Sequence, residues 1–389
     1  MQACASTIAS DQTRPPPIFP ASRPTPPPHP RPPDPHPRSP AHTLDSPPRA
    51  RHPRLTPGLP APHPNSLPRN HSPAHTRLPH PHRTPPPTPD THPPPSTPRH
   101  PTSHPDSDEG EHLFLHSRPG SPDKPNEDYV AAAAGTTTQA LLLDGAGGPA
   151  ELPTGCHHGT PWFVAHLGEA AMTHLRTPDT DLNLALVRAI ASVTRTHRAY
   201  TCDLAHPGTP SSTAALFRLR AGHIEHLVLG DSTFVADIDG EIVTVTDRRI
   251  EAVGHNLWQR MASLPTGTPA HQSARIAFVE HQRRMRNHPR GYPIASVHDQ
   301  AARDALTGSH PAGQVRRLAL LSDGATRFVE FGLGTFADLL DVLDSRTPWR
   351  LFDEIRAAET SDPGGERWPR AKRHDDISVV FLPGGEIGW

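Results

Sequence analysis

The chain has 389 residues, including 53 prolines, 29 histidines and only 3 cysteines, and its formal net charge is −2 at pH 7. Three scattered cysteines, Cys4, Cys156 and Cys202, exclude a disulfide framework and predict no thiolate metal cage. No stretch approaches the roughly 20 consecutive apolar residues of a membrane span, and the N-terminal segment lacks the apolar core of a signal peptide. We therefore expect a soluble, cytoplasmic protein that does not use cysteine for catalysis.

Residues 1–108 differ in composition from the rest. They contain 35 of the 53 prolines and 12 of the 29 histidines, and they have neither Lys nor Glu. Because few apolar residues are available to start a core, we expect this arm to be disordered. Its net charge is about +5 and that of residues 109–389 about −7, so the nearly neutral total combines two opposite halves.

The arm is open to several interpretations. Its arginines could bind nucleic acid or acidic lipid, and its P-x-x-P spacings could be read by a polyproline-binding module. A plain linker or tail is favoured over these, and a translation start assigned too far upstream is a further interpretation. The histidines lack the paired cysteines or helical spacing of a zinc site, so we assign them no metal.

Residues 109–389 are long enough for one domain with a substantial core. Apolar patterning predicts strands near 112–116, 128–134 and 138–143, helices near 160–176 and 181–202, and antiparallel hairpins across 212–246. It then predicts an inserted flap at 247–295, a strand at 316–321, helices near 335–345 and 349–360, and a last strand at 377–382. Two antiparallel sheets flanked by helices account for this order.

Carboxylates lie at the ends of several apolar runs. Asp144, Asp231 and Asp323 each follow such a run within two residues, and Asp375 and Asp376 directly precede the last one. Any one motif could be an ordinary turn, but strand ends can bring several carboxylates into one cleft. Hard oxygen ligands suit Mg²⁺ or Mn²⁺. Two such ions about 3.5–4 Å apart can activate a water for phosphoester hydrolysis without a cysteine or serine nucleophile.

The motifs, taken in order, resemble those of the metal-dependent type 2C serine/threonine protein phosphatases, bacterial members included. They are NED (126–128), DGAGG (144–148), SSTA (211–214), GDS (230–232), SDG (322–324) and DD (375–376), and they span essentially all of residues 109–389. The resemblance implies an α+β fold, an αββα sandwich of two antiparallel sheets flanked by helices. It also implies a binuclear Mn²⁺ or Mg²⁺ centre and hydrolysis of phosphoserine and phosphothreonine in phosphorylated proteins by metal-activated water.

The resemblance assigns metal ligands position by position. Asp144 would bridge two ions, and Gly145 would offer its carbonyl to one of them. Asp323 and Asp375 would hold the other ion. Asp231 would bind a third, weaker ion together with Asp323, so the resemblance implies two or three ions.

It assigns catalytic roles in the same way. Glu127 would act on the second ion through bound water, and Asp128 would support the water network. The family usually has an arginine four residues before this glutamate, where it clamps the substrate phosphate. Here that position is Asp123, and the neighbouring Lys124 could replace the clamp only as a point charge.

Other residues could supply the missing charge or modify the site. Arg249 and Arg290 of the flap are further candidates for phosphate binding. Two more departures from the family, Thr233 in place of an arginine and Ala146 where eukaryotic members have a histidine, leave the metal ligands intact.

Three functions from different classes remain open. The first is an active phosphatase for phosphoproteins, acting as a monomer that binds neither nucleic acid nor membrane. The second is a weak or inactive binding and regulatory module that holds a partner with the flap at 247–295, and the third is a phosphatase for small phosphoesters. The remaining histidines are expected to be scattered and without a ligand role; they are His157, His158, His166, His174 and His197.

Overall fold

The computed structural model describes residues 113–133, 138–177, 180–198 and 200–383. All of them belong to one compact unit, Pro89–Trp389. The predicted arm, residues 1–108, and Cys4 therefore lie outside the described residues. Within these residues no helix combines the length and apolarity needed to cross a membrane.

Two five-stranded sheets, with every strand pair antiparallel, form the centre of the described unit. The first has the order β1 (Phe114–Arg118), β10 (Ile377–Leu382), β9 (Val315–Leu321), β6 (Thr233–Ile238), β7 (Glu241–Thr246). The second has the order β2 (Tyr129–Ala133), β3 (Gln139–Leu143), β4 (Ala214–Arg220), β5 (His223–Leu229), β8 (Leu306–Pro311). Strands from both halves of the chain therefore lie in each sheet.

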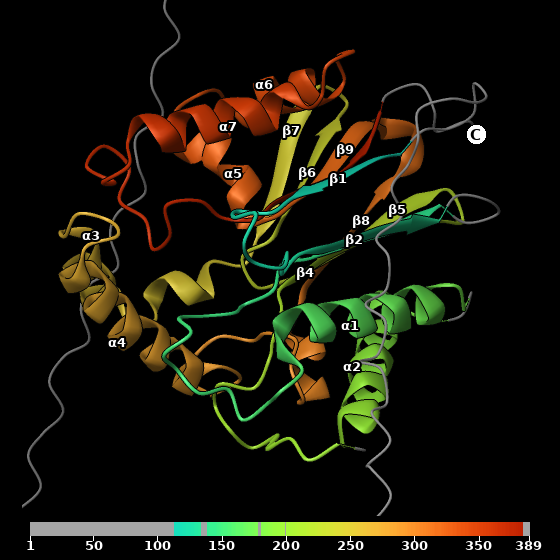
Figure 1. Ribbon diagram of the computed structural model, residues 1–389. Coiled ribbons are helices and arrows are strands. Elements are labelled where there is room, and N and C mark those ends of the chain that lie inside the picture. The colour runs from blue at the N-terminus through green and yellow to red at the C-terminus, as the bar shows by residue number, and fades with distance from the viewer. Residues whose placement is uncertain (1–112, 134–137, 178–179, 199, 384–389) are drawn as a thin grey trace, which may run out of the picture. The chain divides into compact units, whose positions relative to one another are not determined.

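Helices cover the outer face of each sheet (Figure 1). On the second sheet lie α1 (Gly159–Leu175) and α2 (Leu182–Arg198), and on the first lie α5 (Asp323–Glu330), α6 (Phe336–Leu343) and α7 (Arg350–Ser361). The order of layers is helices, sheet, sheet, helices. The structure thus confirms the predicted α+β class and the αββα sandwich.

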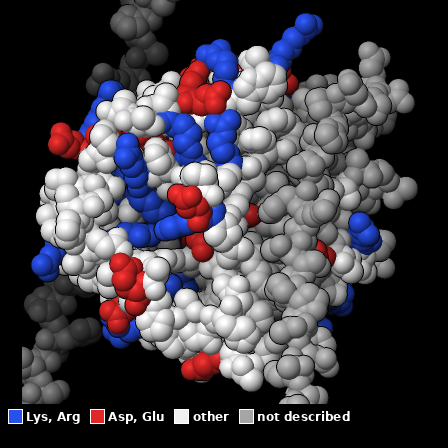
Figure 2. Space-filling view, in the orientation of Figure 1, with Lys and Arg blue, Asp and Glu red and all other residues white. Residues whose placement is uncertain are grey.

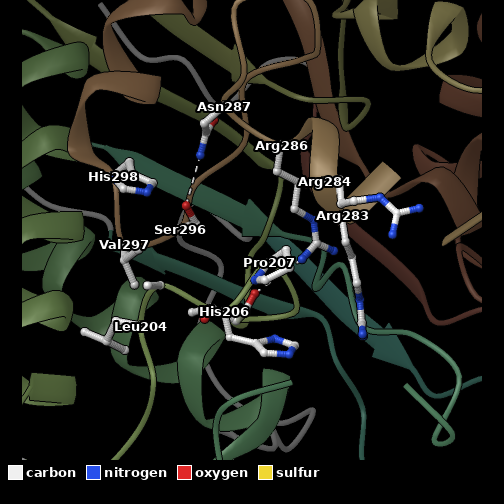
Figure 3. A pocket seen from close by; sticks show the side chains of 12 residues that line it. Leu204, His206, Pro207, Arg283, Arg284, Arg286, Asn287, Ser296, Val297 and His298 are labelled. Carbon is white, nitrogen blue, oxygen red and sulfur yellow. Dashed lines mark hydrogen bonds between the residues drawn. The ribbon is translucent and has the colours of Figure 1, made fainter. Parts of the chain in front are cut away.

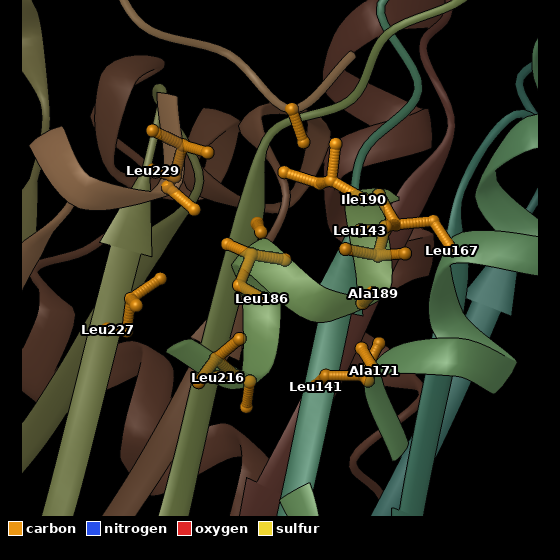
Figure 4. Packing of buried hydrophobic residues seen from close by; sticks show 14 of the residues in the cluster. Leu141, Leu143, Leu167, Ala171, Leu186, Ala189, Ile190, Leu216, Leu227 and Leu229 are labelled. Carbon is orange, nitrogen blue, oxygen red and sulfur yellow. The ribbon is translucent and has the colours of Figure 1, made fainter. Parts of the chain in front are cut away.

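Each interface between layers has its own apolar core. β3 shows why, because successive side chains of a strand point to opposite faces. Leu141 and Leu143 pack against α1 and α2 (Figure 4), whereas Leu142 packs between the two sheets with Phe217 and Phe234. All five residues of β3 are buried. A strand buried on both faces reads as a continuous apolar run, which made β3 recognisable in the sequence.

The predicted flap at 247–295 is a mostly helical insert. It contains the 3₁₀ helix Arg248–Ala252, α3 (His255–Ala262) and α4 (Pro269–Met285). Thr268 caps α4 by accepting a hydrogen bond from the His271 N–H, and Pro269 occupies the first turn, where its missing N–H costs nothing. Trp258 and Phe278 join the two helices with ring centroids 5.7 Å apart. This thin apolar contact explains the weak periodicity of the segment.

Four details differ from the sequence predictions. β8 was not predicted, because its exposed and half-buried residues at the sheet edge lack an apolar run. The second helix ends at Arg198 instead of residue 202. The segment 212–246 does form two hairpins, β4–β5 and β6–β7, but each belongs to a different sheet. Finally, Asp323 begins helix α5, although its Asp-Gly pair was interpreted as a turn.

Candidate metal centre

Carboxylates from separate parts of the chain meet at the ends of the central strands. Asp144 follows β3, Asp323 follows β9, Asp375 precedes β10, Asp231 joins β5 to β6, and Asp128 precedes β2. The backbone N–H of Asp323 donates to Asp144 Oδ2 at 3.3 Å. Both sheets contribute, so the two layers must pack before these side chains can form one cluster.

Burial and mutual repulsion raise the pKa values of this acidic cluster. Burial, followed by the charges of Asp323 and Asp128, raises the pKa of Asp144 well above its usual value. Burial and Asp323 raise the pKa of Asp231 to about 7. Burial and Asp375 likewise raise the pKa of Asp323. Carboxylates that repel one another in a dry site gain stability from a bound cation, because the cation offsets both effects.

Asp375 is the exception, because two cationic side chains contact it. Lys372 Nζ lies 2.6 Å from Asp375 Oδ1, and an Arg327 guanidinium nitrogen lies 3.0 Å from Asp375 Oδ2. Although burial opposes ionisation, these cations lower the pKa of Asp375. An ammonium group and a guanidinium therefore balance part of the negative charge of the cluster.

The adjacent Asp376 has a different set of partners. It accepts hydrogen bonds from the backbone N–H of Gly120 at 2.7 Å and of Glu127 at 2.8 Å. The repulsion expected between Asp375 and Asp376 is thus relieved by cations on one side and by backbone donors on the other. Asp376 fixes the segment that carries Glu127 and Asp128.

Asp128 and Glu127 have environments that oppose ionisation. Asp128 is 2% exposed, and its Oδ2 has no hydrogen-bond partner within the described chain. Burial, then the charge of Asp376, raises the pKa of Asp128 well above its usual value. Burial also raises the pKa of Glu127, against the attraction of Lys372. A buried carboxylate oxygen without a donor is the kind of atom that a cation or its bound water would satisfy.

The glycines after Asp144 allow a close approach to Glu127. A Cβ atom on Gly147 would lie 2.2 Å from Glu127 Oε2, and one on Gly145 would lie 2.3 Å from the Glu127 carbonyl oxygen. The Gly145 carbonyl accepts a hydrogen bond from the Gly147 N–H at 2.8 Å. Side chains are excluded here, so the loop packs directly against the glutamate.

The SSTA motif holds the backbone of Asp144. The Ser212 hydroxyl and the Thr213 N–H both donate to the Asp144 carbonyl, each at 2.9 Å. From the insert, Arg286 donates to the Ala146 carbonyl at 2.8 Å. Backbone and side-chain donors therefore fix the loop on which Asp144 lies.

The basic residues that the sequence suggested for phosphate binding differ from the basic residues that lie near the acidic cluster. Lys124 is exposed, as is Asp123. Arg249 is bound to Asp247 at 2.8 Å, and Arg290 is exposed in a turn. None of these three basic residues is paired with the acidic cluster in the described part of the chain.

Helix α4 contributes an arginine that the sequence did not single out. Arg275 is partly buried, and its Nε has no hydrogen-bond partner among the described residues. Burial lowers the pKa of Arg275, and the negative charges of Asp375, Glu151 and Glu127 oppose this shift. Figure 2 shows basic side chains gathered on the left of this face, where the insert lies in Figure 1, with acidic side chains beside them. Only packing of the insert reveals this proximity.

A pocket of about 200 Å³ lies beside the insert but away from the carboxylates (Figure 3). Its lining includes His206, Arg283, Arg286 and Asn287, and Asn287 Nδ2 donates to Ser296 Oγ at 3.0 Å. No acidic side chain lines it. The pocket therefore offers no ligands for a hard cation, and the acidic cluster remains the candidate site.

The acidic cluster suits Mn²⁺ or Mg²⁺. Its donors are carboxylate and carbonyl oxygens, which these hard ions prefer, and Asp128 Oδ2 is an unsatisfied buried oxygen. The structure brings together Glu127, Asp128, Asp144, Asp231, Asp323 and Asp375, and it leaves Lys124 outside. Sequence reasoning missed Arg275 and Arg327.

One prediction about the spacing of the cysteines and histidines was wrong. The cysteines and histidines were expected to be too scattered to form a cage. The ligand atoms of Cys156, His158, His197 and Cys202 instead lie within 4.8 Å of one another. The reason is tertiary, because packing of α1 against α2 joins segments about 40 residues apart in the sequence.

Comparison with known proteins supports one family. The sequence profile described as protein phosphatase 2C matches residues 120–355. No curated protein matches the chain.

Solved structures of low sequence identity also match the chain. The Mycobacterium tuberculosis serine/threonine phosphatase PstP/Ppp is 17% identical, with a TM-score of 0.42 over 70% of this chain and 98% of that one. Serine/threonine phosphatase Stp1 from Staphylococcus aureus is 12% identical, with a TM-score of 0.42 over 72% and 98%. A C. elegans sex determining protein is 14% identical, with a TM-score of 0.40 over 71% of this chain, and the match spans only 65% of that protein's chain.

Proposed function

The chain belongs to the protein phosphatase 2C family, and from this premise we propose that it is a metal-dependent phosphoprotein phosphatase acting on phosphoserine and phosphothreonine. The observation that carries the proposal is the meeting of carboxylates from five separate motifs in one cluster. Two divalent ions held there would neutralise phosphoryl oxygens and supply an activated water. The proposed enzyme comprises residues 109–389, with 247–295 as its flap, and acts as a monomer.

The proposed metal ligands are the carboxylates of the cluster together with one carbonyl. Asp144 and the Gly145 carbonyl are candidates for one ion, and Asp323 with Asp375 for the other. Asp231, whose pKa is raised by burial and by Asp323, is the candidate for a third, weaker ion. The backbone bonds that hold Asp144 support this assignment, since ligands fixed in advance bind with a smaller entropic cost.

Glu127 and Asp128 are assigned to the water network. Burial raises the pKa values of both carboxyl groups and so favours their protonated forms. Asp376 orients them by accepting the Glu127 N–H. These two carboxyl groups are therefore the proposed participants in proton transfer.

Arg275 is our candidate for binding the substrate phosphate in place of the family arginine. A guanidinium offers two parallel donors that match phosphate oxygens, which the exposed Lys124 cannot do. The unpartnered Nε of Arg275 and the attraction that Asp375 and Glu127 exert on its charge support the assignment. The insert would then contribute to substrate binding and not only to loop support.

Hydrolysis by the full chain tests the proposal directly. A phosphothreonine peptide and a small aryl phosphate would each be assayed with Mn²⁺, with Mg²⁺ and with a chelator. We expect turnover that the chelator abolishes and that falls at least about 100-fold in Asp144→Asn and Asp323→Asn, because both lose a charged ligand. Asp341→Asn is the control, since Asp341 pairs with Arg317 outside the cluster. Thermal unfolding would establish that each variant is folded.

The outcomes separate the competing functions. Turnover of the aryl phosphate without turnover of peptides would favour a phosphatase for small phosphoesters. Full activity of both cluster variants would refute the metal assignment. A folded wild-type protein without metal-dependent turnover would favour a regulatory binding module. Asp123, which occupies the usual arginine position, supports that alternative.

A further inference from the structure

Two cysteines and two histidines gather where helix α1 begins and helix α2 ends. Cys156 lies in the loop before α1, and His158 occupies the position directly before that helix. His197 lies in the last turn of α2, and Cys202 lies just beyond it. Figure 1 shows α1 and α2 packed together beneath the second sheet. The cluster therefore joins two segments that belong to the same helical layer, on the opposite side of the sheet from α5, α6 and α7.

The four ligand atoms lie within 4.8 Å of one another, and three of their separations are close to the edges of a small tetrahedron. Cys156 Sγ lies 3.1 Å from His197 Nε2 and 3.6 Å from His158 Nδ1. Cys202 Sγ lies 3.4 Å from His158 Nδ1. With bonds of about 2.3 Å to sulfur and 2.0–2.1 Å to nitrogen, tetrahedral zinc separates its ligand atoms by about 3.4–3.8 Å. A single ion could therefore be held with only small adjustments.

The surroundings keep these side chains in place. His197 is fully buried, and its Nδ1 has no hydrogen-bond partner in the described chain. His158 stacks on Trp162 with ring centroids 4.3 Å apart, and Tyr200 contacts the His158 ring edge-on at 4.4 Å. A set of ligands whose rotamers are restricted by packing loses little entropy when it binds an ion.

The chemistry of the cluster differs from that of the acidic cluster. Thiolates and imidazoles are ligands of softer or borderline ions, and two of each form a common structural zinc site. Zinc would therefore be preferred at this cluster, and Mn²⁺ or Mg²⁺ at the acidic cluster.

We propose that this chain binds one structural Zn²⁺ through Cys156, His158, His197 and Cys202. The ion ties the start of α1 to the end of α2. It also anchors the segment that runs from Asp144 through the glycine-rich loop into α1. All four ligands are protein side chains, so the site is closed and has no position for a substrate. Zinc binding at this site does not depend on the proposed phosphatase activity, so an experiment can refute one of these two proposals without refuting the other.

Cobalt substitution of the full-length protein is the sharpest test. The arm contains 12 histidines that could bind zinc adventitiously, so a zinc count alone does not locate the ion. Tetrahedral Co²⁺ with thiolate ligands gives intense visible bands and a near-ultraviolet sulfur-to-cobalt charge-transfer band, which histidine or carboxylate sites lack. We expect these bands at one Co²⁺ per chain in reduced wild-type protein, and we expect Zn²⁺ to displace the Co²⁺.

Variants assign the bands to the two cysteines of the cluster. Cys156→Ser and Cys202→Ser should each shift the charge-transfer band and weaken Zn²⁺ binding at least about 100-fold, because each removes one thiolate. His174→Asn, in the last turn of α1 and outside the cluster, should bind as wild type does. Asp144→Asn should also keep the bands, because it changes only the acidic cluster. If Cys156→Ser does not fold, Cys202→Ser still decides the assignment, since Cys202 lies beyond the helix.

Three results would overturn the proposal. One is the absence of thiolate bands in folded, fully reduced protein at saturating Co²⁺. Another is unchanged bands in both cysteine variants, which would move the thiolate ligand elsewhere, for instance to Cys4. The third is a Cys156–Cys202 disulfide in protein isolated under reducing conditions, because the same proximity would then serve a covalent bond.

Discussion

Single charges decide which groups of the acidic cluster are ionised. Asp375 is held in its charged form by Lys372 and Arg327, although burial opposes this, whereas burial and Asp323 keep the pKa of Asp144 high. Arg327 also pairs with Glu359, so it links the cluster to helix α7. The cluster is therefore uneven, with a cation-balanced side at Asp375 and an unbalanced side at Asp144. The unbalanced side has the most to gain from divalent ions.

Arg275 provides a test at the residue scale. Arg275→Met should raise KM for a phosphothreonine peptide about tenfold, with a smaller change in kcat, because it removes donors that bind the phosphate before and during reaction. Arg275→Lys should recover only part of the loss, since lysine lacks the planar fork. Steady-state kinetics, with calorimetry to show unchanged Mn²⁺ binding, would measure this.

The matched control lies on the same helix. Arg284 is exposed on α4 and pairs with Glu280 at 2.9 Å. Arg284→Met should leave KM unchanged. Equal effects of the two substitutions would assign the result to the general charge of the insert and not to Arg275.

At the scale of elements, strand ends and helix starts position the functional groups. Asp323 lies in the first turn of α5, directly after β9, and Gly324 permits the tight join because an added Cβ would lie 1.9 Å from the Asp376 carbonyl oxygen. An acidic residue in the first turn also interacts favourably with the helix dipole. The same strand-to-helix junction thus stabilises α5 and delivers a carboxylate to the cluster.

Helix α6 carries a capping box whose contribution can be measured. Thr335 Oγ1 accepts the Asp338 N–H at 3.2 Å, and Asp338 Oδ2 accepts the Thr335 N–H at 2.8 Å. Thr335→Ala should lower the free energy of unfolding by about 1 kcal/mol, because it leaves an N–H of the first turn unsatisfied. Urea unfolding followed by circular dichroism would measure the difference.

Two further substitutions make that test specific. Thr335→Ser keeps the hydroxyl and should retain most of the stability. Ser273→Ala removes an exposed hydroxyl in the interior of α4 and should change the free energy of unfolding by less than about 0.5 kcal/mol. A loss in Thr335→Ser as large as in Thr335→Ala would contradict the capping role.

At the scale of the whole molecule, the two sheets enclose a core that also contains a titratable group. His226 of β5 is 3% exposed and stacks on Phe234 with ring centroids 4.3 Å apart. Burial, with a smaller effect of His310, lowers the pKa of His226 from 6.5 to about 4. Between about pH 4 and pH 6.5, His226 is therefore mostly neutral in the folded chain but binds a proton in the unfolded chain.

The sign of the pH effect follows from this difference. As pH falls from about 6.5 to about 4, the unfolded state gains a proton and the folded state does not, so stability contributed by neutral His226 is lost. The loss amounts to at most about 3 kcal/mol. His226→Gln should flatten the pH dependence of the free energy of unfolding in this window. His223→Gln, exposed on the same strand, should not, and equal slopes for His226→Gln and wild type would refute the assignment.

Much of the fold could be predicted from local patterns. Buried strands such as β3 and β10 are apolar runs of the right length, and α1 and α2 show apolar residues at helical spacing. β8 was not predicted because an edge strand needs no apolar run. The start of α5 was not predicted because an Asp-Gly pair is typical of turns. In both cases a strand that packs on the element lies far away in the sequence, β5 for β8 and β10 for α5.

The sequence by itself determined which carboxylates lie at the ends of which strands. It also determined the family, because each motif lies next to its strand in the chain. Only the tertiary structure decided which side chains meet. It brought Arg275 of the insert within electrostatic reach of Glu127, set Lys372 and Arg327 against Asp375, and gathered Cys156 with His197. The physical reason is that such contacts arise from packing between layers, and packing depends on the positions of whole helices and sheets, which no local pattern specifies.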